Sequence, residues 1–348
     1  MSLARLVEVG GARVREHAPL GTRTTYRVGG TARVLVTLAR RRDLVELGPH
    51  LADLELDLVA VGNGSNLLVA DGEVAVCAVV LEGEFAGLDW RDEAGAVLVE
   101  LGAGLDLPVA ARRLARAGVT GFEWAVGVPG TVGGAVAMNA GGHGSDTAAS
   151  LVSATLWREG ATLTRDAASL GLGYRHSALG AGELVLGATL RLGRGDPAVA
   201  EEEVRAVVRW RREHQPGGAN AGSVFRNPPG DHAARLIETA GLKGWRRGSA
   251  RVSEKHANFI QADEGGRAED VYGLIVEVRA RVLEATGVAL VCENRFLGFG
   301  DPASAGAPRS RRARAVGPRR RSPSGRARGP GGPGCAARRW WSSCSPSW

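Results

Sequence analysis

One glycine-rich segment organises the rest of the chain: Gly127-Val128-Pro129-Gly130-Thr131-Val132-Gly133-Gly134-Ala135-Val136-Ala137-Met138-Asn139-Ala140-Gly141-Gly142. Six of these residues are glycines, and a proline shapes the turn between the first two of them. Glycine loses more backbone entropy on folding than any other residue, so a run this rich in glycine needs a reason. Either its backbone approaches a ligand closely and cradles an anion with N–H groups, or it is a plain connector between strands. The segment alone leaves both interpretations open.

A second loop of the same kind favours ligand binding. The apolar residues 56–61 predict a buried strand that leads into Gly62-Asn63-Gly64-Ser65-Asn66. This loop lacks the Gly-Lys-Ser/Thr ending of an NTPase phosphate-binding loop, and Leu67 follows where a Rossmann fingerprint has its third glycine. Two phosphate-type loops without either signature predict a dinucleotide held by a different fold.

The distribution of charge argues against a folded domain that binds nucleic acid. The chain has 348 residues and a formal net charge of +7. Residues 301–348 contain 11 arginines and one aspartate, a net +10, which leaves −3 for the first 300 residues. These arginines lie among Pro, Gly, Ser and Ala with no apolar periodicity, so we expect a disordered tail. Binding of DNA or RNA through this tail, independent of sequence and sensitive to salt, is an alternative function.

The remaining composition is typical of a soluble globular protein, with 44% hydrophobic residues. No apolar run is long enough to span a bilayer, and the N-terminus lacks the pattern of a signal peptide, so we expect a cytoplasmic protein. The four cysteines, Cys77, Cys292, Cys335 and Cys344, show no Cys-x-x-Cys spacing. This argues against a metal site or a redox dithiol, and we expect reduced thiols.

Hydrophobic periodicity predicts a mixture of helices and strands. Helices are expected at 42–51, 107–117, 198–214, 231–240 and 268–285, strands at 32–38, 56–61, 81–101, 183–192 and 288–292, and a hairpin at 153–164. The charged helix at 198–214, which stops before Pro216, marks the expected domain boundary. We therefore predict an N-terminal segment (1–20), a first domain (21–195), a smaller second domain (196–300) and the tail (301–348).

Seven motifs follow one another between about residues 15 and 300. They are Tyr26-Arg27-Val28-Gly29-Gly30; the loop 62–66; the loop 127–134 with Asn139-Ala140-Gly141; Tyr174-Arg175-x-Ser177; Gly222-Ser223-x-Phe225-x-Asn227-Pro228; Ser253-x-Lys255-His256-Ala257-Asn258-Phe259; and Glu293-x-Arg295. Together they resemble the UDP-N-acetylenolpyruvoylglucosamine reductases. The first three are shared with other flavin domains of the vanillyl-alcohol oxidase type, whereas the last four are more specific to this reductase.

The resemblance implies an α+β fold: a two-part FAD-binding domain of the vanillyl-alcohol oxidase type, followed by a smaller α+β substrate-binding domain. The 48 residues that separate Arg175 from Ser223 resemble the family's second type, which lacks an extra loop over the substrate. The sequence departs from the family pattern at Asn294, where an aliphatic residue is usual, and at Cys292. Another flavin oxidoreductase of the same domain class would share the glycine loops but not the later motifs.

The resemblance also implies the reaction and its participants: noncovalent FAD, NADPH as hydride donor and a UDP-sugar substrate, on a monomer. Reduction of an enol ether conjugated to a carboxylate needs fixed positive charge and an acid. Arg175 would pair with the carboxylate through two parallel donors, and Ser223 would protonate the strongly basic enediolate. Glu293 would share the charge if protonated, or orient a water or Arg175. Without their motifs, a structural salt bridge for Arg175, a turn for Ser223 and a solvated side chain for Glu293 would be the commoner interpretations.

Binding residues carry over from the same motifs. The cofactor-binding residues are Gly62, Asn63, Gly64, Ser65, Asn66, Leu67, Gly127, Pro129, Gly130, Thr131, Gly133, Gly134, Asn139 and Gly141. The substrate-binding residues are Tyr174, Asn227, Lys255 and His256. Arg209, Arg211 and Arg212 are candidates for the diphosphate, although a charge run on a helix is usually a solvated face.

Overall fold

The computed structural model describes residues 3–300 and 302, and all of these belong to one compact unit. The predicted disordered tail, with Cys335 and Cys344, lies outside the described residues except for Pro302. No helix in the described part of the chain is both long and apolar enough to cross a membrane. The domain boundaries at residues 20, 195 and 300 stay predictions.

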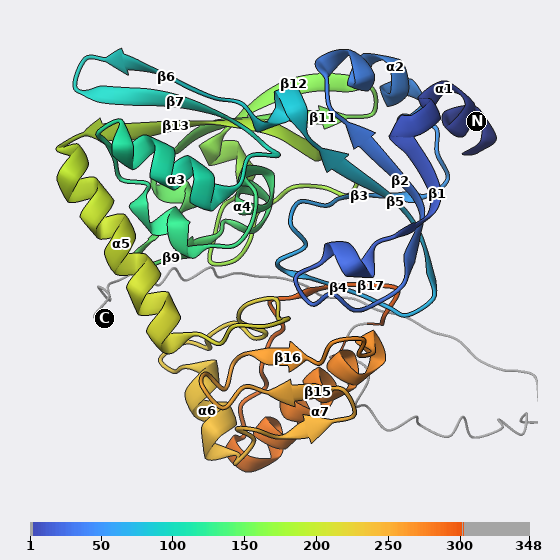
Figure 1. The fold of residues 1–348 in the computed structure, drawn as a ribbon, viewed down its shortest axis with the longest axis vertical. Helices are drawn as coiled ribbons and strands as arrows, with labels where there is room; N and C mark the ends of the chain where they lie inside the picture. The colour runs from blue at the N-terminus through green and yellow to red at the C-terminus, as the bar shows by residue number, and fades with distance from the viewer. Residues whose placement is uncertain (1–2, 301, 303–348) are drawn as a thin grey trace, which may run out of the picture. The chain divides into compact units, whose positions relative to one another are not determined.

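The first part of the chain forms a four-stranded sheet in the order β1-β2-β5-β3 (Figure 1). Its strands are β1 (Val14–Pro19), β2 (Thr31–Leu38), β3 (Asp57–Ala60) and β5 (Glu73–Leu81). Strands β2, β5 and β3 are parallel, and β1 is antiparallel to β2. Leu6 of α1 (Leu3–Gly10) and Leu47 of α2 (Arg41–Ala52) pack into one core with Val34 and Val79. The parallel strand β3 ends directly before the first glycine loop.

The second part is an antiparallel sheet in the order β12-β11-β13-β7-β6, with β8 paired to the end of β13. Its strands are β6 (Leu88–Glu93), β7 (Ala96–Gly102), β8 (Val119–Thr120), β11 (Leu151–Arg158), β12 (Ala161–Asp166) and β13 (Leu184–Arg194). Helices α3 (Leu107–Arg116) and α4 (Val132–Met138) share its hydrophobic core. The short strands β9 (Gly141–Gly142) and β10 (Ser145–Asp146) form a hairpin after α4.

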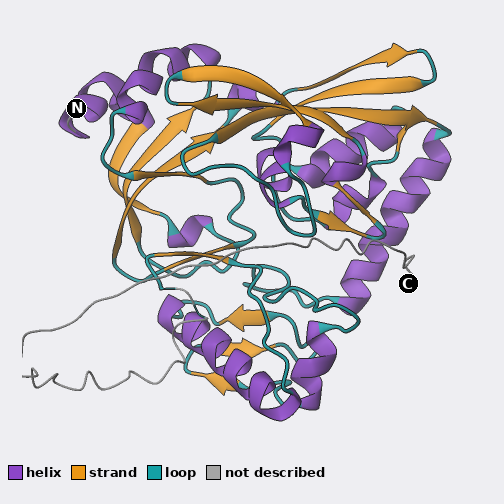
Figure 2. Cartoon of the chain, turned by 180° about the vertical axis from the view of Figure 1, so that it is seen from behind, coloured by secondary structure: helices purple, strands orange, loops and turns teal. Residues whose placement is uncertain are grey.

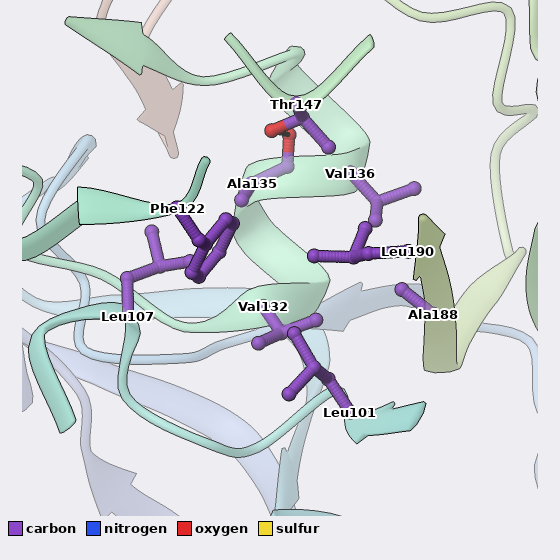
Figure 3. A pocket seen from close by; sticks show the side chains of 9 residues that line it. All are labelled: Leu101, Leu107, Phe122, Val132, Ala135, Val136, Thr147, Ala188 and Leu190. Carbon is purple, nitrogen blue, oxygen red and sulfur yellow. Dashed lines mark hydrogen bonds between the residues drawn. The ribbon is translucent and has the colours of Figure 1, made fainter. Parts of the chain in front are cut away.

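The core under α4 is densely packed. Figure 3 shows Val132 and Val136 of α4 beside Leu101 of β7 and Leu190 of β13, around a cavity of only about 10 Å³. A space of this size is no larger than one water molecule, so it is a packing defect and not a ligand site. The packing fixes α4, and with it the second glycine loop, against the sheet.

The third part begins with α5 (Pro197–His214), which leads from the antiparallel sheet to a smaller α+β unit (Figure 1). This unit contains α6 (Ala233–Thr239), α7 (Ala268–Thr286), β14 (Arg246–Arg247), β15 (Ala250–Val252) and β16 (Ile260–Ala262). Figure 2 shows α7 crossing the three short strands, and its apolar face shares one core with Val252 and Phe225. Finally, β17 (Arg295–Leu297) pairs in parallel with β4 (Leu67–Val69), directly after the first glycine loop.

The predicted helices correspond to α2, α3, α5, α6 and α7, whereas several observed elements, among them α1, β1, β5 and α4, were not predicted. Helix α4 lies inside the glycine-rich segment, where intrinsic helix propensity is poor. It forms because Thr131 caps it by accepting a hydrogen bond from Gly134 N at 3.4 Å, and because its apolar face is buried. The prediction of a strand at 288–292 is wrong. That segment is joined to residues 224–226 by hydrogen bonds at its end, too few for a regular strand.

Candidate active site

A single cavity of about 710 Å³ collects residues from all three parts of the fold. A volume of this size is in the range of cofactor and ligand pockets. Of the predicted cofactor-binding residues, those lining it are Gly62, Asn63, Gly64, Ser65, Asn66, Leu67, Gly127, Pro129, Gly130, Thr131, Gly133, Gly134 and Gly141. The predicted catalytic residues Arg175, Ser223 and Glu293 line the same cavity.

The two glycine loops contact each other at the cavity wall. A Cβ at position 62 would lie 2.4 Å from Thr131 Oγ1, and one at position 130 would lie 3.1 Å from Ser65 Oγ. Position 62 therefore requires glycine, because any side chain would push the loops apart. The backbone N–H groups of Gly62 to Asn66 donate to no acceptor within residues 3–300 and 302. A row of backbone donors at a cavity wall fits the pyrophosphate of a dinucleotide such as FAD.

Asn139 is the one predicted cofactor-binding residue that does not line the cavity. Its Nδ2 donates to Gly173 O at 3.0 Å and to Asp146 Oδ2 at 3.1 Å, and its Oδ1 accepts from Ala148 N at 2.9 Å. The amide is buried and its groups are used inside the protein. Through Gly173, Asn139 holds the turn that carries Arg175.

Arg175 lies in a tight turn with a backbone φ of 54°, a left-handed conformation that is uncommon for a residue with a side chain. Its Nη2 donates to Gly141 O at 2.9 Å. Its Nε lies 2.8 Å from Glu293 Oε1, but the N–H is not directed at that oxygen, so the contact is an ion pair without an aligned hydrogen bond. Strained backbone of this kind persists where surrounding contacts hold it and is common at active sites.

Glu293 is the partner of Arg175 and is itself mostly buried, with 16% of its side chain exposed. Burial raises the pKa of the Glu293 carboxyl above its ordinary value, while the charges of Arg175 and Arg226 oppose that rise. Its backbone N donates to Val224 O at 2.7 Å. This hydrogen bond fixes Glu293 beside the segment that carries Ser223.

The chain directly after Ser223 is held by Asn258. Val224 N donates to Asn258 O at 2.9 Å, and the Asn258 side chain exchanges two hydrogen bonds with the Phe225 backbone, at 3.0 and 2.8 Å. The Ser223 hydroxyl itself makes no hydrogen bond to any described residue. A fixed backbone with an uncommitted hydroxyl in a cavity suits a proton donor to a bound ligand.

The four predicted substrate-binding residues do not line this cavity. The Tyr174 hydroxyl accepts a hydrogen bond from Asn227 N at 3.4 Å, and Asn227 Oδ1 accepts from Ala233 N at the start of α6. Lys255 Nζ donates to Arg212 O at 2.5 Å, at the end of α5. The His256 ring packs edge-on against Phe259, and burial lowers its pKa. Their roles toward substrate stay predictions.

Arg211, one of the three arginines considered for the diphosphate, lines the cavity, and so do Gln215 and Arg295, which were not named as binding residues. Arg211 Nε donates to Gln215 Oε1 at 2.8 Å, and burial lowers the pKa of Arg211. Arg209, two residues earlier, instead pairs with Glu202 at 2.7 Å on the exposed face of α5. The spacing of charges along α5 does not show which of these two arginines faces the cavity. Arg295 belongs to the Glu293-x-Arg295 motif, which was recognised in the sequence.

The comparisons with known proteins agree with the site described above. Residues 32–165 match a family model described as an FAD binding domain. This match, together with paired glycine loops that fit a dinucleotide, defines a flavin-binding protein with a second domain completing its cavity. Residues 214–297 match the model of the UDP-N-acetylenolpyruvoylglucosamine reductase C-terminal domain.

Whole-chain relatives identify the family. The chain is 42% identical over 301 residues to the UDP-N-acetylenolpyruvoylglucosamine reductase of Synechococcus sp. (strain WH7803), covering 83% of this chain and 94% of the relative. It is 43% identical over 295 residues to that of Thiobacillus denitrificans, covering 80% and 90%. The crystal structure of the reductase from Thermus caldophilus matches with a TM-score of 0.71 at 37% identity, covering 82% of this chain and 98% of that one. The chain belongs to the UDP-N-acetylenolpyruvoylglucosamine reductase family, which confirms the predicted family and fold class.

Proposed function

We propose that this chain reduces UDP-N-acetylglucosamine enolpyruvate to UDP-N-acetylmuramate, a step in peptidoglycan precursor synthesis, with FAD as its cofactor and NADPH as reductant. The observation that carries this proposal is the convergence of Arg175, Ser223 and Glu293 on the cavity lined by both glycine loops. Membership of the reductase family supports the same activity.

The reaction adds one hydride and one proton across a carbon–carbon double bond. When bound, FAD supplies the redox chemistry, because it accepts hydride from NADPH and delivers it to the terminal carbon of the enolpyruvyl group. We call these two stages the NADPH half-reaction and the substrate half-reaction. The protein must hold the cofactor, bind the substrate carboxylate, and provide the proton for the adjacent carbon.

Backbone donors of residues 62–66, with the facing loop 127–134, would hold the FAD pyrophosphate. Arg175 would pair with the substrate carboxylate, whose negative charge grows as hydride arrives. The Ser223 hydroxyl would give its proton to the carbon beside that carboxylate and recover one from solvent. Its O–H is a weak acid, sufficient only because the enediolate is strongly basic.

Glu293 would assist as a neutral carboxylic acid. Its raised pKa keeps the proton on the carboxyl at higher pH than for a solvated glutamate. An anionic substrate carboxylate in the cavity favours the protonated form further. A protonated Glu293 would donate a hydrogen bond to the developing charge, next to Arg175.

The absorbance spectrum of the purified protein, taken without oxygen, tests this function. We expect a yellow protein whose flavin is released by acid, bleaches with NADPH and regains its colour with the enolpyruvyl substrate. A folded, colourless protein that FAD cannot reconstitute would contradict the cofactor. A reduced flavin that the substrate leaves bleached would contradict the reaction.

Proposals on the subfamily, the oligomeric state, the localisation and the domain bounds complete the proposed function. The short separation of Arg175 and Ser223 supports the second type of the family, without the extra loop. We further propose a cytoplasmic monomer with domains at 21–195 and 196–300, which size-exclusion chromatography and limited proteolysis test. We propose no specific nucleic-acid partner, and the polyanion affinity of the basic tail is tested below.

A further inference from the structure

Asn294 is a buried polar residue beside Glu293, with only 4% of its surface exposed. Its Nδ2 donates to Asn66 Oδ1 at 2.8 Å and to Ala221 O at 3.2 Å. Its Oδ1 accepts from the Tyr26 hydroxyl at 3.4 Å. Both N–H groups and the oxygen of the amide are therefore used, which fixes the orientation of the side chain.

Two of these partners, Asn66 and Ala221, line the cavity from different segments of the chain. Asn66 is in the first glycine loop, and Ala221 lies two residues before Ser223. Asn66 Nδ2 also donates to the Glu293 carbonyl at 3.1 Å, so the two amides join the loop to the glutamate as well. One buried side chain thus connects the cofactor loop, the serine segment and the glutamate.

Tyr26 makes the third contact but has no other role in the cavity. Its side chain is fully buried and does not line the cavity, and its hydroxyl bonds to no described residue except Asn294. A buried hydroxyl without a partner costs free energy, so Tyr26 depends on Asn294 for stability.

We propose that Asn294 is a positioning residue that holds the Ser223 segment at a fixed place relative to the first glycine loop. This inference rests on the proposed function, because it concerns the alignment of the proton donor with the flavin-bound substrate. An apolar side chain of similar size at 294 would fill the space but leave Ala221 O, Asn66 and Tyr26 without their partner. The chain before Ser223 would then lose this anchor, while Asn258 still holds the chain after it, and a displacement of about 1 Å can cost roughly 10²-fold in rate.

Four variants of the FAD-loaded protein separate positioning from stability: Asn294→Leu, Tyr26→Phe, the double variant, and Asp43→Asn as a control. Asp43 is equally buried and is bonded to Arg13 at 2.8 Å, but it is remote from the cavity lining. For each, the melting temperature of the FAD-loaded protein and the rates of both half-reactions are measured.

We expect Asn294→Leu to lower the melting temperature by roughly 3 to 8 °C, from its unpaired buried groups. It should slow the substrate half-reaction roughly 10-fold to 10²-fold and leave the NADPH half-reaction within about threefold. Tyr26→Phe should leave both rates unchanged. Adding Tyr26→Phe to Asn294→Leu should recover part of the melting temperature, because it removes the unpaired hydroxyl, while the substrate half-reaction stays slow. Asp43→Asn should lower the melting temperature and leave both half-reaction rates unchanged.

Two results would overturn the inference. One is a substrate half-reaction at the wild-type rate in Asn294→Leu, and the other is its recovery together with the melting temperature in the double variant. If Asn294→Leu does not fold, the substrate half-reaction of the double variant tests the inference. A slow rate supports it, and a wild-type rate overturns it. Failure of the proposed function looks different, because the wild-type flavin would then not be reoxidised by the substrate at all.

Discussion

Two glycine-rich loops supply one group of residues that line the cavity, whereas the three predicted catalytic residues reach it from three distant segments of the chain. We call residues 62–67 and 127–134 the cofactor wall, and Arg175, Ser223 and Glu293 the substrate wall. The cofactor wall depends on close approach of the two loops, as between the backbone of Gly62 and the side chain of Thr131. The substrate wall depends on long-range hydrogen bonds, as between Glu293 N and Val224 O.

This difference predicts two kinds of failure. Damage to the cofactor wall should weaken FAD binding and so affect both half-reactions together. Damage to the substrate wall should leave the flavin in place and reducible by NADPH, and slow only the substrate half-reaction. The ratio of the two half-reaction rates therefore reports which wall a substitution has changed.

The largest effect is expected for Ser223→Ala. Because the NADPH half-reaction needs no proton from Ser223, its rate should stay close to that of the wild type. The substrate half-reaction should slow by roughly 10² to 10⁴, the usual contribution of a positioned general acid. Stopped-flow absorbance of the flavin measures both rates, and Ser223→Cys should restore part of the loss.

Ser65→Ala is the matched control, since it removes the same hydroxyl from the cofactor wall of the same cavity. It should weaken FAD binding without changing the ratio of the two half-reaction rates. A Ser223→Ala variant that reoxidises at the wild-type rate would show that Ser223 is only a turn residue.

Gly62→Ala should damage the cofactor wall. The new methyl would meet Thr131, and an overpacking cost of about 1–3 kcal/mol corresponds to a roughly 10-fold to 10²-fold weaker FAD affinity. Titration of the apoprotein with FAD measures this. Gly87→Ala is the control, because Gly87 has ordinary backbone angles and a Cβ there would approach nothing closer than 3.7 Å. Equal FAD affinities of the two variants would contradict the proposed contact between the loops.

Glu293→Gln should change how the substrate half-reaction depends on pH. A carboxyl with a raised pKa holds its proton at low pH and loses it as pH rises through that pKa. The wild-type rate should therefore fall, by roughly 10-fold, as pH rises through the Glu293 ionisation above its ordinary value. The glutamine variant keeps a hydrogen-bond donor at all pH values, so this step should disappear from its profile. If the pH profile of Glu293→Gln matches that of the wild type, the ionisation belongs to another group.

The smallest effect is expected from removal of residues 303–348, since every motif ends by Arg295. A chain ending at Pro302 should keep its flavin and both half-reaction rates, because the residues that define the two walls all lie between 62 and 293. It should lose affinity for a heparin column, in a salt-dependent manner, if the arginines bind polyanions. A soluble, flavin-loaded truncation with impaired turnover would show that the segment contributes to the site.

Some of the substrate wall was predictable only through motifs. Arg175, Ser223 and Glu293 are ordinary polar residues by local context, and their common cavity depends on segments 48 and 70 residues apart. Arg211 and Arg209 illustrate what was not predictable. They are neighbours on one charged helix, and only the packing of α5 places the first at the cavity and the second beside Glu202.

The sequence by itself predicted the two glycine loops that line the cavity, the principal helices and the family. Glycine spacing, helical periodicity and turn residues are local properties, expressed within a few residues of one another. Tertiary structure alone decided which polar side chains form their hydrogen bonds inside the protein. The amides of Asn139, Asn227 and Asn294 all bond to protein groups, and helix α4 forms in a glycine-rich segment because its apolar face is buried. The physical reason is that a hydrogen-bond partner or a buried face is supplied by residues far away in the chain, which no local pattern records.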